Sequence, residues 1–304
     1  MRDFTVLIIA NSNSDLSLLK FNEFKIVNVL SEEFEIFCKK TFTRESEFLE
    51  KIKNDYQYDK TESYAIIKKE NKKFGDRRIY NIYNFLLLLF PSSLLVEYIL
   101  DYQIVNHDLR FLSSFHNDRK SYNTSEFLIF SNCDVEAINL FIEKHFENHL
   151  NINYLKSSIL NYINAFDSNY THLSFIALCI CLESVTNGKT ELIYRMARNI
   201  AVICGKDEMT SAIIFKNIKK IYNLRSDIVH GSNFSDDTIN DYMYYLELIC
   251  SKLIIELLKH NVNNIDSLNE KITSLGFGER SRISENWKET NFNKKIEIEI
   301  YNTI

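Results

Sequence analysis

The chain has 304 residues, of which 45% are hydrophobic and 25% are charged, and its formal net charge at pH 7 is −5. This length and composition are typical of a soluble globular protein with a sizeable core, in one large domain or in two. Because the molecule is mildly acidic, its overall field does not attract a polyanion, and contact with nucleic acid requires a local basic patch.

Residues 1–132 are predicted to form a mixed, β-rich domain. Alternating apolar and polar residues, many of them β-branched or aromatic, predict strands at residues 4–10, 24–30, 34–40, 64–69 and 126–131. Helices are predicted at residues 77–90 and 93–100. This half shows no glycine-rich phosphate loop, no nucleophile elbow and no usefully spaced carboxylate pair. We therefore interpret it as a module for recognition, sensing or oligomerisation.

Residues 133–262 are predicted to form a helical bundle, so the expected fold class is α+β. Asp134, Asp207 and Ser235 each precede a helical pattern and are suited to cap it. Residues 173–185 are apolar nearly all round, which predicts the most buried helix of the bundle, and Glu183 is their only charge.

Two further segments complete the predicted organisation. The long amphipathic helix after Ser235 has enough apolar surface to help build a dimer interface. Residues 263–304 form a weakly patterned C-terminal extension, in which an edge strand is predicted at residues 296–300.

The six cysteines show neither a Cys-x-x-Cys pair nor the spacing of a metal finger. Cys179, Cys181 and Cys204 lie in apolar, helix-like runs, so buried and reduced thiols are expected. With no signal-peptide pattern at the start, these thiols predict a cytoplasmic protein. The most apolar window, residues 85–100, is broken by a proline and polar residues, so no membrane span is predicted.

The stretch that organises the chain chemically is residues 214–232, IFKNIKKIYNLRSDIVHGS. Read as a helix, it carries Arg225 in the middle of its apolar face, where a cation needs an anionic partner. His230 falls at the last turn, where the helix dipole favours a protonated imidazole, and Gly231 is suited to end the helix in the left-handed conformation. One helix end is thus expected to present a guanidinium and a titratable imidazole side by side, which suggests a phosphate site.

An arginine followed by a histidine after four to six residues is a weak motif by itself, because short patterns recur by chance. Arg110 and His116 also satisfy it, but they stand in a stretch that we interpret as irregular and polar, with no helix end behind them. The surrounding pattern therefore favours Arg225 and His230.

Three blocks resemble the ApeA-like HEPN domain family in order and spacing: residues 182–183 (LE), 189–195 (KTELIYR) and 221–231 (IYNLRSDIVHG). The resemblance covers roughly residues 135–260. It implies a helical bundle, commonly dimeric, and a metal-independent endoribonuclease of the kind found in toxin, antiphage and RNA-decay systems. It also implies that Arg225 and His230 are the catalytic pair. Ser226 departs from the Asn, Asp or His that many members carry there, and such families include non-cleaving members.

Elementary chemistry agrees with that assignment. RNA cleavage without metal or cofactor requires a base for the ribose 2′-OH, an acid for the leaving 5′-oxygen and a cation on the phosphate. His230 is suited to proton transfer near neutral pH, and Arg225 is suited to bind the phosphate with two hydrogen bonds. Because one histidine cannot easily fill both proton-transfer roles at once, a homodimer with two facing motifs is expected.

Further polar residues are assigned supporting or structural roles. Glu183 is expected to hold Arg195 or Arg198 from the neighbouring helix, or to orient Arg225. Others near the motif are Tyr222, Ser226 and Asp227. A basic rim for RNA, or alternatively an ordinary solvated surface, is expected from Lys189, Lys216, Lys219 and Lys220 together with the two arginines.

Each of these residues also has a purely structural interpretation. Arg225 could serve only in an ion pair with Glu183 that ties two helices together, and His230 only as a cation at a helix end. His145 and His149, four residues apart, are a metal pair or core residues. The tyrosines at positions 242, 244 and 245 stack on bases or pack in the core.

Two function classes follow from the sequence. The first is a cytoplasmic HEPN-type ribonuclease that acts on single-stranded RNA as a toxin or antiphage effector, with the N-terminal half sensing a trigger or restraining the nuclease. An antitoxin or another defence-system protein is then a candidate partner. The second is a non-catalytic HEPN module that binds RNA or another protein.

Overall fold

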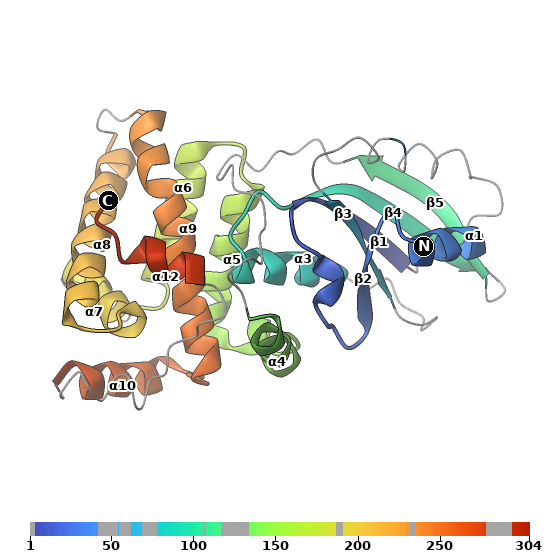
Figure 1. Ribbon diagram of the computed structural model, residues 1–304. Helices are drawn as coiled ribbons and strands as arrows, with labels where there is room; N and C mark the ends of the chain where they lie inside the picture. Colours follow the sequence, from blue (N-terminus) through green and yellow to red (C-terminus); the bar gives the residue numbers. More distant parts are fainter. Residues whose placement is uncertain are drawn as a thin grey trace.

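The computed structural model describes residues 4–41, 54, 62–68, 78–105, 108–116, 134–186, 191–231, 235–277 and 294–304. A strand-rich part at one end of the molecule is followed by a bundle of helices at the other (Figure 1). The expected α+β class, with strands first and helices afterwards, is confirmed. Among the described residues, no helix is both long enough and apolar enough to cross a bilayer.

Five strands form one antiparallel sheet in the order β2-β3-β1-β4-β5. Their bounds are β1 (Phe4–Ser12), β2 (Phe24–Asn28), β3 (Glu62–Lys68), β4 (Leu95–Val105) and β5 (Asp108–His116). In the central strand β1, successive side chains point to opposite faces of the sheet, and the residues on both faces are apolar. Val6 and Ile8 face a small core under α1 (Glu32–Thr41), whereas Leu7 and Ile9 face the large core shared with the helices.

Three predicted elements have the wrong type. Residues 34–40 belong to α1, because Ser31 Oγ accepts a hydrogen bond from the Phe34 N–H at 3.2 Å and caps a first turn rich in glutamate. Residues 95–100 are strand rather than helix, because β4 pairs with β1 on one side and β5 on the other. The predicted edge strand at 296–300 lies in a helix, α12 (Lys294–Ile300).

Two other predictions concern the segment with Arg110 and His116 and the segment at residues 126–131. The segment with Arg110 and His116, interpreted from sequence as irregular, is the strand β5. The predicted strand at residues 126–131 lies outside the described residues.

The helical part begins with the capped helix that the sequence predicts, since Asp134 accepts a hydrogen bond from the Ala137 N–H at 3.0 Å. Asp207 forms a capping box with Thr210, and Ser235 caps the long helix that follows it. These caps confirm the predicted helix starts. The helices are α3 (Arg78–Leu89), α4 (Val135–His145), α5 (Asn153–Asp167), α6 (Thr171–Glu183), α7 (Leu192–Cys204), α8 (Glu208–Val229), α9 (Asp236–Lys259) and α10 (Ile265–Phe277).

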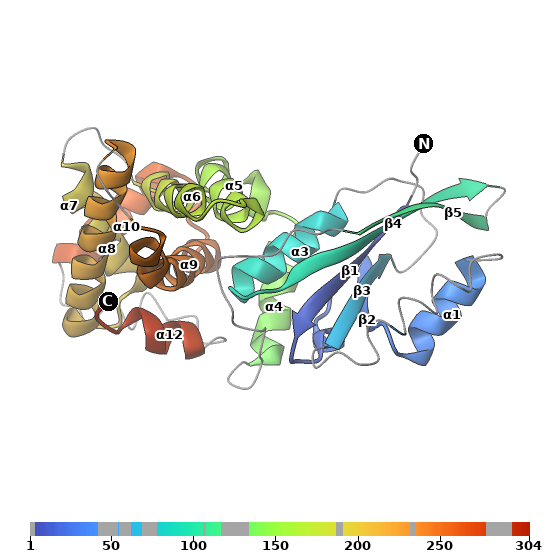
Figure 2. The same ribbon diagram turned by 90° about the horizontal axis from the view of Figure 1, so that it is seen from above.

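The most buried helix of the bundle is α9, not α6 as predicted. Every side chain from Tyr245 to Leu258 is buried, because α9 runs through the middle of the bundle and packs against α6, α5, α7, α3 and α12 (Figure 2). Helix α6 lies in the outer layer and keeps part of its apolar surface accessible. The apolar face of α9 is therefore used inside the chain, and it is not available for the dimer interface that the sequence suggested.

The core is continuous across the predicted boundary at residue 132. Helix α3 inserts its C-terminal end between bundle helices, and two carbonyls at that end accept hydrogen bonds from bundle hydroxyls. The Tyr162 hydroxyl donates to the Leu87 carbonyl at 2.9 Å, and Ser251 Oγ donates to the Leu88 carbonyl at 2.6 Å. These bonds satisfy acceptors that a helix end otherwise leaves unpaired.

The last described segment of the C-terminal extension packs on the bundle. Asn217 of α8 is fully buried, and its amide donates to the Asn302 carbonyl at 2.8 Å. The Tyr301 hydroxyl donates to the Cys204 carbonyl at 3.0 Å, and Ile300 is buried against α9. Residues 294–304 therefore help fix the relative positions of α7, α8 and α9.

Candidate functional site

Arg225 and Glu183 meet where the C-terminal end of α6 lies against α8. Arg225 Nε is 3.2 Å from Glu183 Oε1, and the two side chains are 22% and 20% exposed. The ring of Tyr222, one turn before Arg225, lies 5.4 Å from the guanidinium carbon. The arginine therefore has the anionic partner that its place on an apolar helix face requires. Of the arginines proposed as partners of Glu183, Arg225 is the one with a described ion pair.

Glu183 contacts the Arg225 guanidinium at Nε. Nε is buried and makes no well-aligned hydrogen bond, so its contact with Glu183 is electrostatic. About a fifth of the Arg225 side chain is exposed, and no hydrogen bond of its terminal nitrogens to another described residue is recorded. Burial raises the pKa of Tyr222, the negative charge of Glu183 raises it further, and Arg225 opposes both effects. Glu183 and Tyr222 thus contact the guanidinium, while 22% of the Arg225 side chain remains exposed.

His230 stands at the C-terminal end of α8, as the sequence predicts. Its backbone N–H donates to the Ser226 carbonyl at 3.0 Å, and Gly231 has a φ of 75°, the left-handed conformation expected after a helix. The His230 side chain is exposed. This confirms the predicted helix end, although it does not test a catalytic role for the imidazole.

Arg225 and His230 lie on different faces of α8. Five residues of α-helix correspond to about 140° of rotation about the axis. Arg225 faces α6 in the interior, whereas His230 points to solvent. The structure describes no contact between the two side chains, so their side-by-side presentation stays a prediction.

The lysines of α8 share the face of His230 rather than that of Arg225. Lys216 and Lys219 are exposed and lie within about 40° of His230 around the helix axis. Lys219 Nζ stands 5.6 Å from the Phe215 ring, and Lys220 Nζ donates to the Ile304 carbonyl. Lys189 lies outside the described residues.

The remaining predicted site residues are spread around the motif. Arg195 is exposed and Arg198 is half-buried on α7, which packs against α8. Ser226 is half-buried and Asp227 is exposed in the last turns of α8. No contact of these four residues with the Arg225 guanidinium is described, and the neighbour of Arg195 on α7, Tyr194, packs on Phe215 in the middle of α8.

His145 and His149 are core residues. Their rings pack at 4.6 Å from Phe141 and 4.9 Å from Phe85, and Phe146 O lies 2.5 Å from His149 Nδ1. Burial, and to a smaller extent the charge of Lys144, lower the pKa of His145 to about 4. Among the described residues, no group of three or more potential ligands could hold a metal ion.

Core packing also accounts for the tyrosine cluster of α9. Tyr245 is buried, and its hydroxyl donates to the Ile300 carbonyl at 3.4 Å. Tyr242 and Tyr244 are half-buried and pack against the large core. Cys179, Cys181 and Cys204 are buried thiols that are not joined in a disulfide, as predicted.

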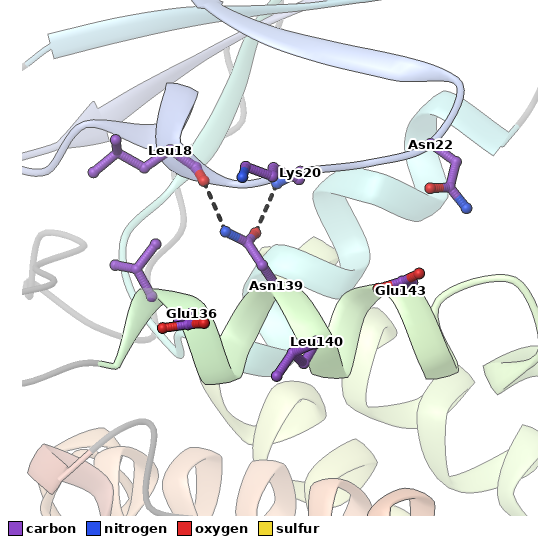
Figure 3. Close-up of a pocket in the computed structure, with 8 residues that line it drawn as sticks. Leu18, Lys20, Asn22, Glu136, Asn139, Leu140 and Glu143 are labelled. Atoms are coloured by element: carbon purple, nitrogen blue, oxygen red, sulfur yellow. Dashed lines mark hydrogen bonds between the residues drawn. The ribbon is translucent and has the colours of Figure 1, made fainter.

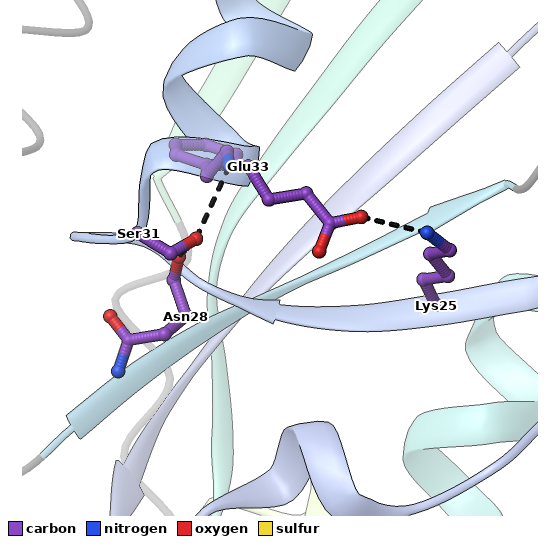
Figure 4. A network of polar contacts seen from close by, with 5 residues as sticks. Lys25, Asn28, Ser31 and Glu33 are labelled. Carbon is purple, nitrogen blue, oxygen red and sulfur yellow. Dashed lines mark hydrogen bonds and ion pairs between the residues drawn. The ribbon is translucent and has the colours of Figure 1, made fainter.

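Two surface hollows lie away from the arginine and histidine. One, of about 730 Å³, separates α4 from residues 18–22, and the Asn139 amide bridges its wall by bonding the Leu18 carbonyl at 3.0 Å and the Lys20 N–H at 2.8 Å (Figure 3). The other lies beside β2 and the start of α1, where Lys25 and Glu33 pair at 2.8 Å (Figure 4). Neither hollow includes a residue that the motif predicts to be functional.

The sequence interpretation missed a set of ionisable residues inside α9. Lys252 Nζ lies 2.9 Å from Glu256 Oε1, and His260 Nε2 lies 3.3 Å from Glu256 Oε2. Glu247 is fully buried, and neither of its carboxyl oxygens has a hydrogen-bond partner. Lys252, Glu256 and His260 follow one another at intervals of four residues in an otherwise apolar stretch. This spacing is a signal from which the sequence could have identified them.

Comparison of the chain with models of protein families, with curated proteins and with solved structures gives no match. The function of the chain is therefore inferred from its own residues and from their arrangement at the ends of α6 and α8.

Proposed function

We propose that the chain is a metal-independent endoribonuclease of HEPN type that acts on single-stranded RNA in the cytoplasm as a toxin or antiphage effector. The observation that carries the proposal is the held guanidinium of Arg225. Glu183 contacts its Nε at 3.2 Å, the Tyr222 ring lies 5.4 Å from its carbon and 22% of the side chain is exposed, so a guanidinium held in this way is suited to bind a phosphate.

Each group has a defined role in the proposed reaction. A base removes the proton of the ribose 2′-OH, the freed oxygen attacks the phosphorus, and the bond from phosphorus to the 5′-oxygen breaks. An acid then protonates that leaving oxygen, so a 2′,3′-cyclic phosphate and a 5′-hydroxyl result. Arg225 stabilises the charge that develops on the phosphate, and His230 transfers protons. Glu183 and Tyr222 are positioning residues, because they act through Arg225.

The proposal requires two copies of the chain. Arg225 and His230 are about 140° apart around α8, so one copy does not offer both groups to one phosphate from one side. Two copies supply two guanidinium groups and two imidazoles, which also provides the separate base and acid. The exposed lysines that share the His230 face, Lys216 and Lys219, are suited to hold the flanking RNA backbone.

The test is cleavage of single-stranded RNA by purified protein in the presence of EDTA. We expect Arg225→Ala and His230→Ala each to lower the rate by roughly 10²–10³-fold, since each removes a group acting in the transition state. Arg225→Lys keeps the charge but loses the planar fork, so it should rescue the rate only in part. The matched control is Met209→Ala, at a 70% exposed position in the first turn of α8. Equal rates for wild type and both alanine variants would exclude the enzyme.

The second candidate is a non-catalytic HEPN module that binds RNA or a protein such as an antitoxin. It is favoured by the same ion pair, because a guanidinium that is 22% exposed and already neutralised can serve structure alone. This alternative predicts retention of labelled RNA or of a partner protein without cleavage, and melting temperatures that fall in Arg225→Ala.

A further inference from the structure

The helices α7 and α8, which pack against each other, carry positive charges along segments that contain no acid. Acidic residues stand at the ends of residues 192–206 and 209–226, at positions 191, 207, 208 and 227, and none stands within them. The exposed cations in these segments are Arg195, Lys216 and Lys219, together with Lys206 and Lys220, which contact Tyr301 and Ile304. In a chain with a net charge of −5, this helix pair is therefore a local basic region.

Tyr194, in the first turn of α7, places an exposed aromatic ring in this region. Its side chain is 54% exposed, and its ring centroid lies 5.7 Å from that of Phe215 in the middle of α8, with the ring planes at 78°. Lys219 Nζ lies 5.6 Å from the same Phe215 ring. The edge-to-face contact orients the tyrosine ring. Phe215 thus holds an accessible π-face and a cation in one place.

We infer that Tyr194 is a stacking position for a base of single-stranded RNA, and that the RNA backbone runs along α8 past Lys216 and Lys219 towards His230. The inference deepens the proposed function and rests on it for RNA as the ligand. Lys219 and His230 are eleven residues apart, which corresponds to about 20° around the helix and about 16 Å along it. A strand bound on this side of α8 therefore leads from the stacked base to the imidazole.

The combination of a ring and cations favours RNA over an acidic protein. A base offers a π-face that stacks on an aromatic ring, and each phosphate offers an anion to a lysine or an arginine. An acidic peptide would use the cations but would have no need of an oriented aromatic ring beside them. Because every base has a π-face, the position binds the strand without selecting a particular base.

Tyr170 is a second exposed tyrosine of the described residues, and its setting differs in charge. It is 63% exposed, and its ring centroid lies 6.0 Å from that of His172. No lysine or arginine occurs from residue 157 to residue 188, so neighbouring positions in the sequence bring it no cation. Tyr170 therefore matches Tyr194 in exposure and in having a ring neighbour, and it serves as the control.

The first test measures binding of a fluorescent single-stranded RNA of about 12 nucleotides by anisotropy. Its ribose 2′-oxygens are methylated, which blocks the attacking group, so binding is measured without cleavage. We expect Tyr194→Ala to weaken binding by about tenfold or more, and Tyr194→Phe, which keeps the ring, to bind like wild type. Tyr170→Ala should also bind like wild type. Unchanged affinity in Tyr194→Ala, or a wild type that binds no RNA, would overturn the inference.

The second test separates stacking from charge. Bases are removed one at a time from the same RNA, and one position should lose about tenfold in affinity for wild type but nothing further for Tyr194→Ala, because base and ring act together. Lys219→Met should instead lower the slope of log affinity against log salt by about 0.7, which Tyr194→Ala should leave unchanged. A series without such a position, in which binding still depends on Lys219, would mean that the surface binds an anion without bases and would overturn the inference.

Binding and cleavage distinguish the failure of this inference from that of the proposed function. A chain that binds the methylated RNA through Tyr194 but does not cut unmodified RNA would refute the proposed function alone. Equal cleavage rates for wild type and Tyr194→Ala, measured at RNA concentrations below saturation, would refute the stacking position alone.

Discussion

Two ion pairs in the helical bundle have similar chemistry and different surroundings. Glu183 and Arg225 meet at the end of α6 with about a fifth of each side chain exposed, whereas Lys252 and Glu256 meet inside α9 with 3% and 1% exposed. Desolvation of a charge costs several kcal/mol in the interior and much less at a partly hydrated site. The interior pair therefore serves to stabilise the fold. The outer pair can exchange part of its interaction for contact with a ligand, because separating it costs less free energy.

Glu247 marks the extreme of the interior region. Its carboxyl group is fully buried one turn from Ser251, and neither oxygen has a hydrogen-bond partner. Burial raises its pKa well above the ordinary value and so favours the neutral form of the group. The comparison teaches that α9 tolerates ionisable groups only when they are paired or uncharged, whereas the end of α6 holds a charged pair within reach of solvent.

The largest expected effect comes from breaking the interior pair. Lys252→Met leaves the Glu256 carboxylate buried without its lysine, and we expect it to lower the free energy of unfolding by about 3–5 kcal/mol. Urea unfolding monitored by circular dichroism measures this change. The exposed Lys156→Met on α5 is the control and should change it by less than about 0.5 kcal/mol.

A double variant sharpens the same comparison. Lys252→Met combined with Glu256→Met removes both charges and should recover much of the stability that the single variant loses, because no unpaired ion remains inside. If Lys252→Met has the same free energy of unfolding as wild type, the interior pair does not stabilise the fold. The proposed difference between it and the Glu183–Arg225 pair is then wrong.

A smaller effect, of opposite sign, is expected at Glu247. Glu247→Met replaces an unpaired carboxyl group by an apolar side chain of similar size and should raise the free energy of unfolding by about 1–3 kcal/mol. Urea unfolding at pH 7 measures it. Destabilisation of the same size would show that the carboxyl group has a bonding partner.

The pH dependence of Glu247 gives a second measurement. The pKa of the folded state lies above that of the unfolded chain, so above pH of about 4.3 the unfolded state binds fewer protons than the folded state. The contribution of Glu247 to stability is therefore complete at low pH and declines as the pH rises through that value. The difference between wild type and Glu247→Met should grow from pH 4 to pH 8, and a constant difference would contradict the burial of a neutral acid.

Local signals identified some elements correctly and misled elsewhere. The caps at Asp134, Asp207 and Ser235 act within one turn, so the sequence reveals them. Residues 95–100 are mostly apolar with Glu97 among them, a pattern that does not separate a helix from a strand, and their strand state depends on pairing with β1 and β5 on either side. Strand pairing of this kind is tertiary, and a single stretch of sequence does not contain it.

The same limit applies to burial. Helices α6 and α9 are both rich in apolar residues, but the sequence does not tell a helix that the chain surrounds from a helix that leaves part of one face exposed. The structure separates them, since α9 has the central position and Leu173 of α6 is 47% exposed.

At the candidate site, the sequence predicts contact between Arg225 and Glu183. Arg225 needs an anion, and Glu183 is the only charge of an apolar helix. One of the sequence interpretations included this ion pair, which the structure has. The spacing of five residues corresponds to about 140° of rotation about the helix axis between Arg225 and His230, so the two side chains leave α8 in different directions. Lys220 and Asn217 bind the segment ending at residue 304, and no local pattern reveals this contact across more than 80 positions.

The smallest expected effect is that of Glu183→Gln. The pair is partly hydrated and lacks a well-aligned hydrogen bond, so its loss should lower the free energy of unfolding by about 0.5–1 kcal/mol, well below the loss expected for Lys252→Met. If Glu183 positions the guanidinium, RNA cleavage should nevertheless fall, and Arg225→Lys should cost less in the Glu183→Gln background than in wild type, because the fork is no longer held. Urea unfolding and single-turnover cleavage separate the two contributions. A loss of 3 kcal/mol or more would place this pair with the interior one, and Arg225 would then serve the fold rather than a phosphate.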